Sequence, residues 1–269
     1  MNDLTRTALA AARAAVAIHR RDRGRIRLEG ADEKARSDYV SRTDLEAQEA
    51  ALAVIRGRHP DHAVLAEEDD TPLEQRLEDW DGRPLWVVDP LDGTANFLHG
   101  HPAFCASVAV AVEGRPEAAA VVSGSTGERW WATRGGGAFK GGRRVSVSPK
   151  RDLGHALVGT GFPFKLLEEL PDYLDQLDRV LRTASGVRRN GSAALDLAAL
   201  AQGSLDAFWE LILMPWDFAA GWLLIEEAGG VVARMDGRAP DLTDGSLMAA
   251  SHPALLESLR EILRRTASS

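Results

Sequence analysis

An apolar strand that ends in a pair of carboxylates constrains the fold of this sequence more than any other feature. The segment from Trp86 to Thr94 changes from large apolar side chains to Asp89 and Asp92, three positions apart. We expect a buried strand over Leu85 to Val88. In α/β folds, ligands lie beyond the carboxyl ends of such strands. The pattern therefore predicts a layered α/β protein with a polar site here, the alternative being a solvated Asx-type turn.

The chain on either side of this segment shows two kinds of patterning. Helical spacing predicts a helix over Leu4 to Arg20, and a capping box of Thr43 and Glu46 predicts one ending near Gly57. A strand over Ala63 to Ala66 and a meander of strands over residues 84–148 should follow. Beyond residue 150 the expected elements alternate: strands at 156–160, 205–211, 231–235 and 247–250, and helices at 171–184, 192–202, 216–228 and 253–265. We therefore expect two α/β units that share a cleft, residues 1–148 and 149–269.

Composition excludes several classes of protein. The 269 residues hold 40 Asp and Glu against 32 Lys and Arg, a net charge of −8, which argues against a dedicated nucleic-acid binder. The single cysteine, Cys105, excludes intrachain disulfides and multi-thiol zinc sites. No apolar run approaches the roughly 20 residues that span a bilayer, so we expect a cytoplasmic protein without membrane partners. The basic residues at 19–27 are interpreted as a solvated loop or hairpin face, with contact to an acidic partner as the alternative.

Further carboxylates lie far away in the sequence. Glu67 follows the strand over 63–66, and Asp217 follows Pro215-Trp216 at the start of an apolar helix. Taken singly, Glu67 could belong to a charged loop and Asp217 could complement a helix dipole. Together with Asp89 and Asp92, they form an all-oxygen set that suits magnesium. Carboxylates shared between two ions would stabilise the attacking and leaving oxygens of phosphoryl transfer to water.

Two competing motifs fail on spacing. Haloacid-dehalogenase phosphatases place a nucleophilic aspartate two residues before the aspartate of an Asp-Gly-Thr triplet, where this chain has Pro90. A calcium EF-hand loop needs ligands at alternate positions, and those are missing here.

The separated motifs resemble, in their order, those of the inositol monophosphatases, especially the bacterial branch. The resemblance covers essentially the whole chain and rests on Ala66-Glu67-Glu68, on Asp89 to Thr94 with Asn96-Phe97, on Thr160 to Lys165, on Gly191 to Ala194, on Pro215-Trp216-Asp217 and on Glu227 to Gly230. It implies that family's αβαβα sandwich. It also implies two to three Mg²⁺ ions, inhibition by lithium and a homodimer.

The resemblance implies a role for each metal ligand. Glu67, Asp89 and the carbonyl of Leu91 should hold one Mg²⁺, and Asp89, Asp92 and Asp217 a second, with a weaker third ion near Glu67. The implied nucleophile is a metal-activated water. Thr94, oriented by Asp44, would position or deprotonate this water together with Glu67. None of the seven histidines lies in a matching motif, and His99 and His101 are interpreted as loop residues.

Substrate binding should involve both halves of the chain. From the residues alone, the amides of Gly93 and Thr94 are expected to receive phosphate. The resemblance adds Glu210, which would accept hydrogen bonds from ring hydroxyls, Asp217 as a further substrate-binding residue, and Ser192 and Ala193, which would line the pocket. It also places Lys34 near the attacking water. Ala66, Ala95 and Asn190 depart from the usual family residues, without removing a metal ligand. The tryptophans at 130, 131, 209 and 222 are interpreted as packing residues.

We therefore expect a Mg²⁺-dependent phosphate monoester hydrolase that acts on myo-inositol 1-phosphate and related small polyol phosphates. Histidinol phosphate, fructose 1,6-bisphosphate, NADP and 3′-phosphoadenosine nucleotides are alternative substrates. A different alternative is a chain that mainly binds RNA or the transcription machinery. The arginine run at 20–27, Arg143-Arg144 and Arg188-Arg189 motivate that alternative, and the net charge of −8 argues against it.

Overall fold

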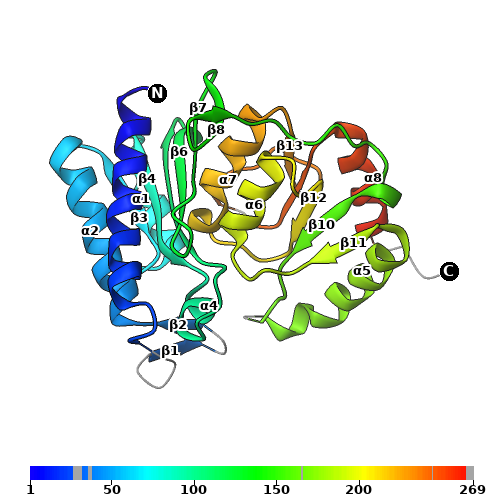
Figure 1. Cartoon of the computed structure of the whole chain (residues 1–269), viewed down its shortest axis with the longest axis horizontal. Coiled ribbons are helices and arrows are strands. Elements are labelled where there is room, and N and C mark those ends of the chain that lie inside the picture. Colours follow the sequence, from blue (N-terminus) through cyan, green and yellow to red (C-terminus); the bar gives the residue numbers. More distant parts are fainter. Residues whose placement is uncertain (27–31, 36–37, 165, 244, 265–269) are drawn as a thin grey trace.

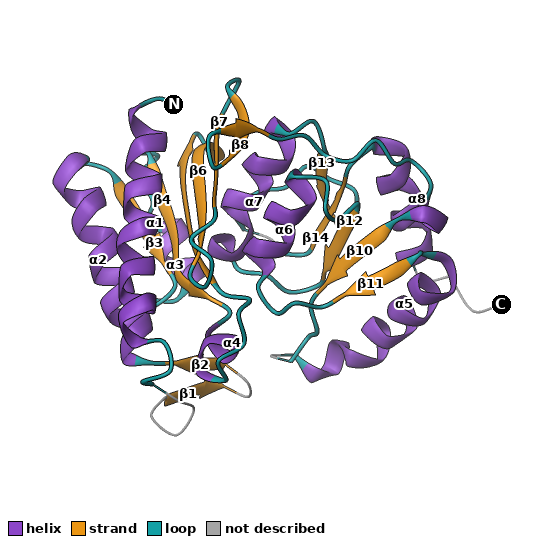
Figure 2. Ribbon diagram, viewed as in Figure 1, coloured by secondary structure: helices purple, strands orange, loops and turns teal. Residues whose placement is uncertain are grey.

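Two β-sheets alternate with three layers of helices (Figures 1 and 2). The computed structural model describes residues 1–26, 32–35, 38–164, 166–243 and 245–264. Helices α1 (Asp3–Asp22) and α2 (Arg42–Arg58) cover the outer face of the first sheet. Helices α6 (Ala193–Ala201) and α7 (Pro215–Glu227) lie between the sheets, and α5 (Leu170–Thr183) and α8 (Pro253–Leu263) cover the second. The αβαβα order that the resemblance implied is confirmed.

The first sheet is the expected meander with one parallel strand added at its edge. Its seven strands, in spatial order, are β3 (Ala63–Ala66), β4 (Leu85–Asp92), β5 (Cys105–Val112), β6 (Arg115–Ser123), β7 (Arg129–Thr133), β8 (Gly137–Lys140) and β9 (Arg143–Arg144). Only the β3–β4 pair is parallel. The carboxyl ends of β3 and β4 therefore lie at the same edge of the sheet, which brings Glu67 toward Asp89.

The second sheet is built from the later part of the chain. Its five strands, in spatial order, are β11 (Gly186–Arg188), β10 (Leu157–Thr160), β12 (Ala207–Glu210), β14 (Leu247–Ala250) and β13 (Val231–Arg234). The pairs of β10 with β11 and β12 are parallel, whereas the pairs of β14 with β12 and β13 are antiparallel. The central strand β12 ends in Glu210, at the edge of the sheet where the parallel strand β10 also ends.

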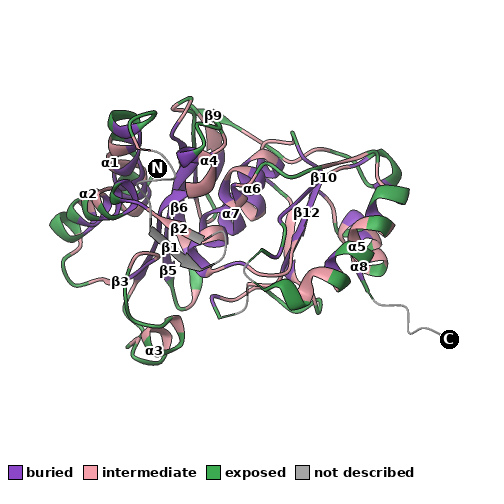
Figure 3. Ribbon diagram, turned by 90° about the horizontal axis from the view of Figure 1, so that it is seen from below, coloured by how far each residue is buried: buried purple, intermediate pink, exposed green. Residues whose placement is uncertain are grey.

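Small side chains let the outer helices approach the first sheet closely. The buried stripe of α1 consists largely of alanines, including Ala8, Ala11, Ala12 and Ala15, and it packs against β-strand residues of the first sheet. The inner helices α6 and α7 are instead apolar on nearly all sides and are buried between the two sheets (Figure 3). A helix that is apolar all round needs such a two-sided environment.

Short elements complete the structure. They are the two-stranded sheet of β1 (Asp32–Ala35) and β2 (Asp38–Val40), helix α3 (Leu73–Glu78), helix α4 (Thr94–Leu98) and the 3₁₀ turns η2 (Leu153–His155) and η3 (Leu167–Glu169). Along the described ranges, no helix is both long and apolar enough to cross a membrane.

Three local predictions are corrected. Strand β4 does not stop at Val88 but runs to Asp92, because Asp89 and Asp92 keep partners on β5 and a register shift accommodates Pro90 between them. The capping box of α2 is formed by Ser41 and Asp44, not by Thr43 and Glu46.

The third correction concerns the basic run at 19–27. Helix α1 continues to Asp22, so Arg20 and Arg21 belong to its last turn and His19 is buried. Arg21 pairs with Asp22 and Glu46. Arg27 lies outside the described residues. The tryptophans at 130, 131, 209 and 222 are all buried, as expected for packing residues.

Candidate active site

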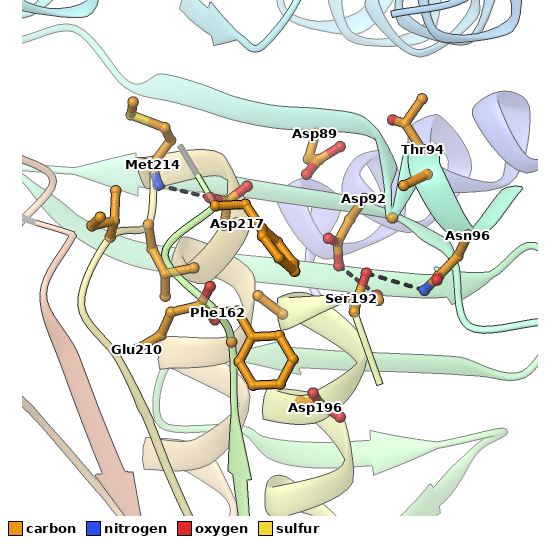
Figure 4. Close-up of a pocket in the computed structure, with 18 of the residues that line it drawn as sticks. Asp89, Asp92, Thr94, Asn96, Phe162, Ser192, Asp196, Glu210, Met214 and Asp217 are labelled. Carbon is orange, nitrogen blue, oxygen red and sulfur yellow. Dashed lines mark hydrogen bonds between the residues drawn. The ribbon is translucent and has the colours of Figure 1, made fainter. Parts of the chain in front are cut away.

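A pocket between the two sheets gathers most of the residues that the sequence singled out. Its lining includes Glu67, Asp89, Leu91, Asp92, Gly93, Thr94, Ser192, Ala193, Glu210 and Asp217. Figure 4 shows Asp89, Asp92 and Thr94 facing Asp217 and Glu210 across this space. The carboxylates thus come from both sheets and from the helix α7 between them.

The register shift in β4 aims two aspartates from one strand. Asp89 lies opposite Ser107 on β5, and Asp92 lies opposite Cys105. The Asp89 carboxylate accepts the Leu91 amide at 2.9 Å. Next to this bulge, Gly93 has φ 89°, and a Cβ there would come within 2.8 Å of the Ala103 carbonyl oxygen. Only glycine fits this turn into α4.

Asp92 is fixed from the other half of the chain. Its Oδ2 accepts the Ser192 hydroxyl at 2.6 Å and the Ala194 amide at 2.8 Å, at the start of α6. The Cys105 thiol lies 3.6 Å from the same oxygen. Ser192 therefore lines the pocket with its hydroxyl engaged by a carboxylate, an arrangement that local sequence patterns do not reveal.

Glu67 and Asp217 arrive from separate elements. The Glu67 amide donates to the Val88 carbonyl at 3.1 Å, which extends the β3–β4 pairing into the turn. In α7, the Asp217 Oδ2 accepts the Met214 amide at 2.7 Å and caps the helix. Asp217 therefore both caps α7 and lines the pocket. Ser107 on β5 also donates to the Trp216 carbonyl at 3.2 Å, which ties α7 to the first sheet.

Burial and mutual repulsion disfavour the charged form of the carboxylates in this pocket. Burial, and then the charges of Glu67, Asp92 and Asp217, raise the pKa of Asp89 well above its ordinary value. Burial and Asp217 raise the pKa of Asp92 to about 7, against the hydrogen bonds from Ser192, Ala194 and Cys105. Such a group of buried oxygens is stabilised when cations neutralise it.

The donor set therefore fits hard divalent cations by its chemistry. Carboxylates and a backbone carbonyl are the ligands that Mg²⁺ takes in proteins. Over the ranges that the structure describes, no three His, Cys, Asp or Glu side chains are grouped as a ready-made metal cluster. Unscreened like charges repel one another. The individual ligand assignments stay predictions.

A hydroxyl and a buried acid lie beside the carboxylates. The Thr94 hydroxyl lies 2.8 Å from Asp44 Oδ1 and 3.0 Å from the Leu91 carbonyl oxygen. Asp44 also accepts the Ser41 amide at 2.8 Å and the Ser41 hydroxyl at 2.6 Å. Burial raises the pKa of Asp44, against these hydrogen bonds. Asp44 thus both completes the capping box of α2 and accepts the hydrogen bond from Thr94.

The opposite wall carries Glu210 and several residues that sequence analysis did not assign. Burial, and then the charge of Asp217, raise the pKa of Glu210, whereas Arg189 lowers it. A Cβ at Gly161 would overlap the Glu210 carboxylate, so this glycine makes room for it. The Arg189 guanidinium lies 5.1 Å from the centre of the Phe162 ring and 5.2 Å from that of Phe164.

Arg189, Phe162, Tyr39 and Asp196 all line the pocket. The sequence signal for Arg189 was only a basic pair, and the signal for Phe162 was only a family-like motif. Lys34 lies on β1, but its side chain is outside the described residues. His99 and His101 are exposed and absent from the pocket lining.

Comparisons with known proteins agree with this arrangement. Residues 1–267 match the model of the inositol monophosphatase family. The chain is 41% identical over 253 residues to the Nus factor SuhB of Pseudomonas aeruginosa, covering 93% of this chain and 92% of that one. It is 39% identical over 245 residues to an inositol-1-monophosphatase of Rhizobium meliloti, covering 91% and 90%.

A solved structure shares the whole fold. The extragenic suppressor protein SuhB of Bartonella henselae superposes with a TM-score of 0.89 at 34% identity, covering 98% of this chain and all of that one. The family match extends over nearly the whole chain, and its typical motifs converge on the pocket. The chain therefore belongs to the inositol monophosphatase family.

Proposed function

We propose that this chain is a magnesium-dependent phosphate monoester hydrolase that acts on myo-inositol 1-phosphate and related small polyol phosphates. The observation that carries the proposal is that four carboxylates, Glu67, Asp89, Asp92 and Asp217, line one pocket together with Thr94, whose hydroxyl is bonded to Asp44. When bound, Mg²⁺ supplies charge neutralisation and makes water acidic enough to attack phosphorus at neutral pH. Glu67, Asp89, Asp92, Asp217 and the Leu91 carbonyl would hold two to three ions.

The protein's own groups would orient the attacking water. Thr94 has one hydroxyl proton, which points toward the acceptors Asp44 Oδ1 and the Leu91 carbonyl. Its lone pairs can therefore accept a hydrogen bond from a water in the pocket, and Glu67 provides a second acceptor. Two acceptors engage both protons of the water and thereby fix the direction of its lone pairs. The amides of Gly93 and Thr94 would bind the phosphate oxygens.

The far wall would select the rest of the substrate. Glu210 and Asp217 supply carboxylate oxygens that accept hydrogen bonds from hydroxyl groups, as a polyol offers. Ser192 and Ala193 would shape the pocket between the phosphate and the polyol. The name of the Rhizobium meliloti relative supports this substrate class.

Phosphate release from a panel of substrates tests the proposal. With MgCl₂, we expect the highest kcat/KM on myo-inositol 1-phosphate, followed by lower values on histidinol phosphate, fructose 1,6-bisphosphate, NADP and 3′-phosphoadenosine nucleotides. The variant Asp217→Asn keeps a helix-capping oxygen and should lose the activity, whereas the exposed control Asp178→Asn should keep it. A hundredfold preference for histidinol phosphate would contradict the named substrate. Full activity of Asp217→Asn would contradict the metal assignment.

A second candidate is a role in the transcription machinery, for which the name of the Pseudomonas aeruginosa relative is the specific support. Arg20, Arg143 and Arg188 are exposed and could each contact an acidic partner. Binding of Asp217→Asn to single-stranded RNA at 50 and 200 mM salt tests this candidate. Salt-sensitive binding by the inactive variant would favour it. Absence of retention on RNA at 50 mM salt would count against it.

A further inference from the structure

The turn that carries Glu67 is held by an arginine that no sequence motif identified. Arg76, on α3, donates from Nη1 to the Ala66 carbonyl at 2.6 Å and to the Asp69 carboxylate at 3.2 Å. These acceptors lie on either side of Glu67 in the chain. The Arg76 side chain is only 12% exposed, and its bond to Ala66 is partly buried, whereas Asp69 lies at the surface.

The same guanidinium reaches the element that supplies Asp217. It lies 5.4 Å from the centre of the Trp216 ring, and Trp216 directly precedes Asp217 at the start of α7. Arg76 thus contacts both the end of β3 and the start of α7. Its Nε is buried and has no acceptor among the described residues.

A second side chain holds the turn from the opposite direction. Gln48, on α2, accepts the Glu68 amide at 3.0 Å and donates to the Asp69 carboxylate at 3.1 Å. Gln48 is buried. Asp69 therefore receives one donor from α2 and another from α3, and it links the two supports.

We propose that Arg76, assisted by Gln48, is a positioning residue that fixes Glu67 relative to Asp217 for binding of a divalent cation. The inference rests on the proposed function, because it assigns Glu67 and Asp217 to the same metal centre. Without Arg76 the turn gains conformational freedom, which must be lost again when an ion binds. The substitution should therefore weaken cation binding more than turnover at saturating Mg²⁺.

Replacing Arg76 with a side chain of similar length tests this role. We expect Arg76→Met to raise the Mg²⁺ concentration for half-maximal activity by about 10- to 100-fold, with kcat at saturating Mg²⁺ within about threefold of the parent. The Mg²⁺ concentration that half-maximally raises the Tm should shift equally, and this readout needs no turnover. Arg76→Lys keeps the positive charge and one donor nitrogen, and it should shift both midpoints less. This milder variant serves if Arg76→Met does not fold.

Arg179→Met provides a matched control. Arg179 also bonds to backbone carbonyls, those of Ile262 at 2.6 Å and Leu263 at 3.3 Å, and to Asp175, but it joins α5 to α8 outside the pocket. We expect this variant to lower the Tm and leave both Mg²⁺ midpoints unchanged. Unchanged midpoints in Arg76→Met and Arg76→Lys, with a lower Tm alone, would overturn the inference while leaving the proposed function intact. If the unsubstituted protein itself showed no response to Mg²⁺, the proposed function would fail, and the inference with it.

Discussion

The buried acid Asp206 and the buried acids of the pocket have opposite shifts in pKa. Asp206, directly before β12, accepts hydrogen bonds from the Leu157 amide at 2.7 Å, the Ser148 hydroxyl and the Lys150 ammonium at 2.9 Å. Burial acts to raise the pKa of Asp206, but these donors together lower it. In the pocket, burial and neighbouring carboxylates raise the pKa of Asp89. Asp206 and Asp89 are both only 1% exposed.

The difference shows what each region requires. The charge of Asp206 is satisfied by protein donors, and this acid does not line the pocket. The pocket acids also accept hydrogen bonds, but Asp89 and Asp92 in addition face the charges of neighbouring carboxylates, and such a buried like-charge group costs stability until cations neutralise it. The comparison therefore separates the two acids by their partners, since the exposed fraction of the residue is the same for both.

The largest expected effect concerns activity. Asp89→Asn should reduce Mg²⁺-dependent phosphate release at least about 100-fold, because it removes a ligand that both ions would share. Asp206→Asn, assayed well below its Tm, should retain activity within about threefold. Initial rates at saturating Mg²⁺ measure both. Equal losses in the two variants would break the comparison.

The second effect concerns stability. Asp206→Asn should lower the free energy of unfolding by about 3 kcal/mol, since it leaves buried donors without a charged acceptor. Urea denaturation with EDTA present measures this change. Ser148→Ala removes a single donor and should cost about 1 kcal/mol, which provides a graded control. If Asp206→Asn left the free energy of unfolding unchanged, the bonds of Asp206 with Ser148 and Lys150 would be dispensable for stability.

The third effect depends on pH and concerns the base behind β4. Burial lowers the pKa of His19 from 6.5 to about 4, although Nε2 donates to the Pro90 carbonyl at 2.8 Å. Between pH 6.5 and about 4 the unfolded chain binds a proton at His19 that the folded protein does not. The free energy of unfolding therefore decreases as the pH is lowered through this range. We expect His19→Gln, which can keep the bond to Pro90, to lose about 2 kcal/mol less than the parent between pH 7 and pH 4. Urea denaturation at several pH values measures the difference. Parallel stability curves for the two proteins would contradict this prediction.

The smallest effect has the opposite sign. In EDTA, Asp89→Asn should raise the free energy of unfolding by about 1 kcal/mol, because it removes one of the repelling charges and keeps an acceptor for the Leu91 amide. Urea denaturation next to Asp206→Asn gives the sign directly. Destabilisation of Asp89→Asn in EDTA would mean that the pocket acids are as well satisfied as Asp206.

Local patterns in the sequence predicted the order of the elements because each strand and helix has its own periodicity. They failed where long-range contacts decide. The extension of β4 through Pro90 depends on pairing with β5. The capping box of α2 is a separate and local error, because Ser41 and Asp44 form it although Thr43 and Glu46 also match the pattern. The hydrogen bond from Ser192 to Asp92 spans 100 positions, so no local window contains it.

The candidate site shows the same division. Carboxylates at strand ends and at a helix start were visible as short motifs, and the fold brings them to one pocket. Arg76 and Gln48 were not visible, because a lone arginine or glutamine on a helix resembles any solvated residue. Their importance follows from the partners that the fold gives them, Ala66 and Asp69.

The effect of Mg²⁺ on thermal unfolding tests the central claim most directly. We expect saturating Mg²⁺ to raise the Tm of the unsubstituted protein by on the order of 5 °C, because the ions bind only the folded state. Asp206→Asn should show the same rise from a lower starting Tm, and Asp89→Asn should show almost none. An equal rise in Asp89→Asn, or no rise in the unsubstituted protein, would contradict the assignment of the pocket as a magnesium site.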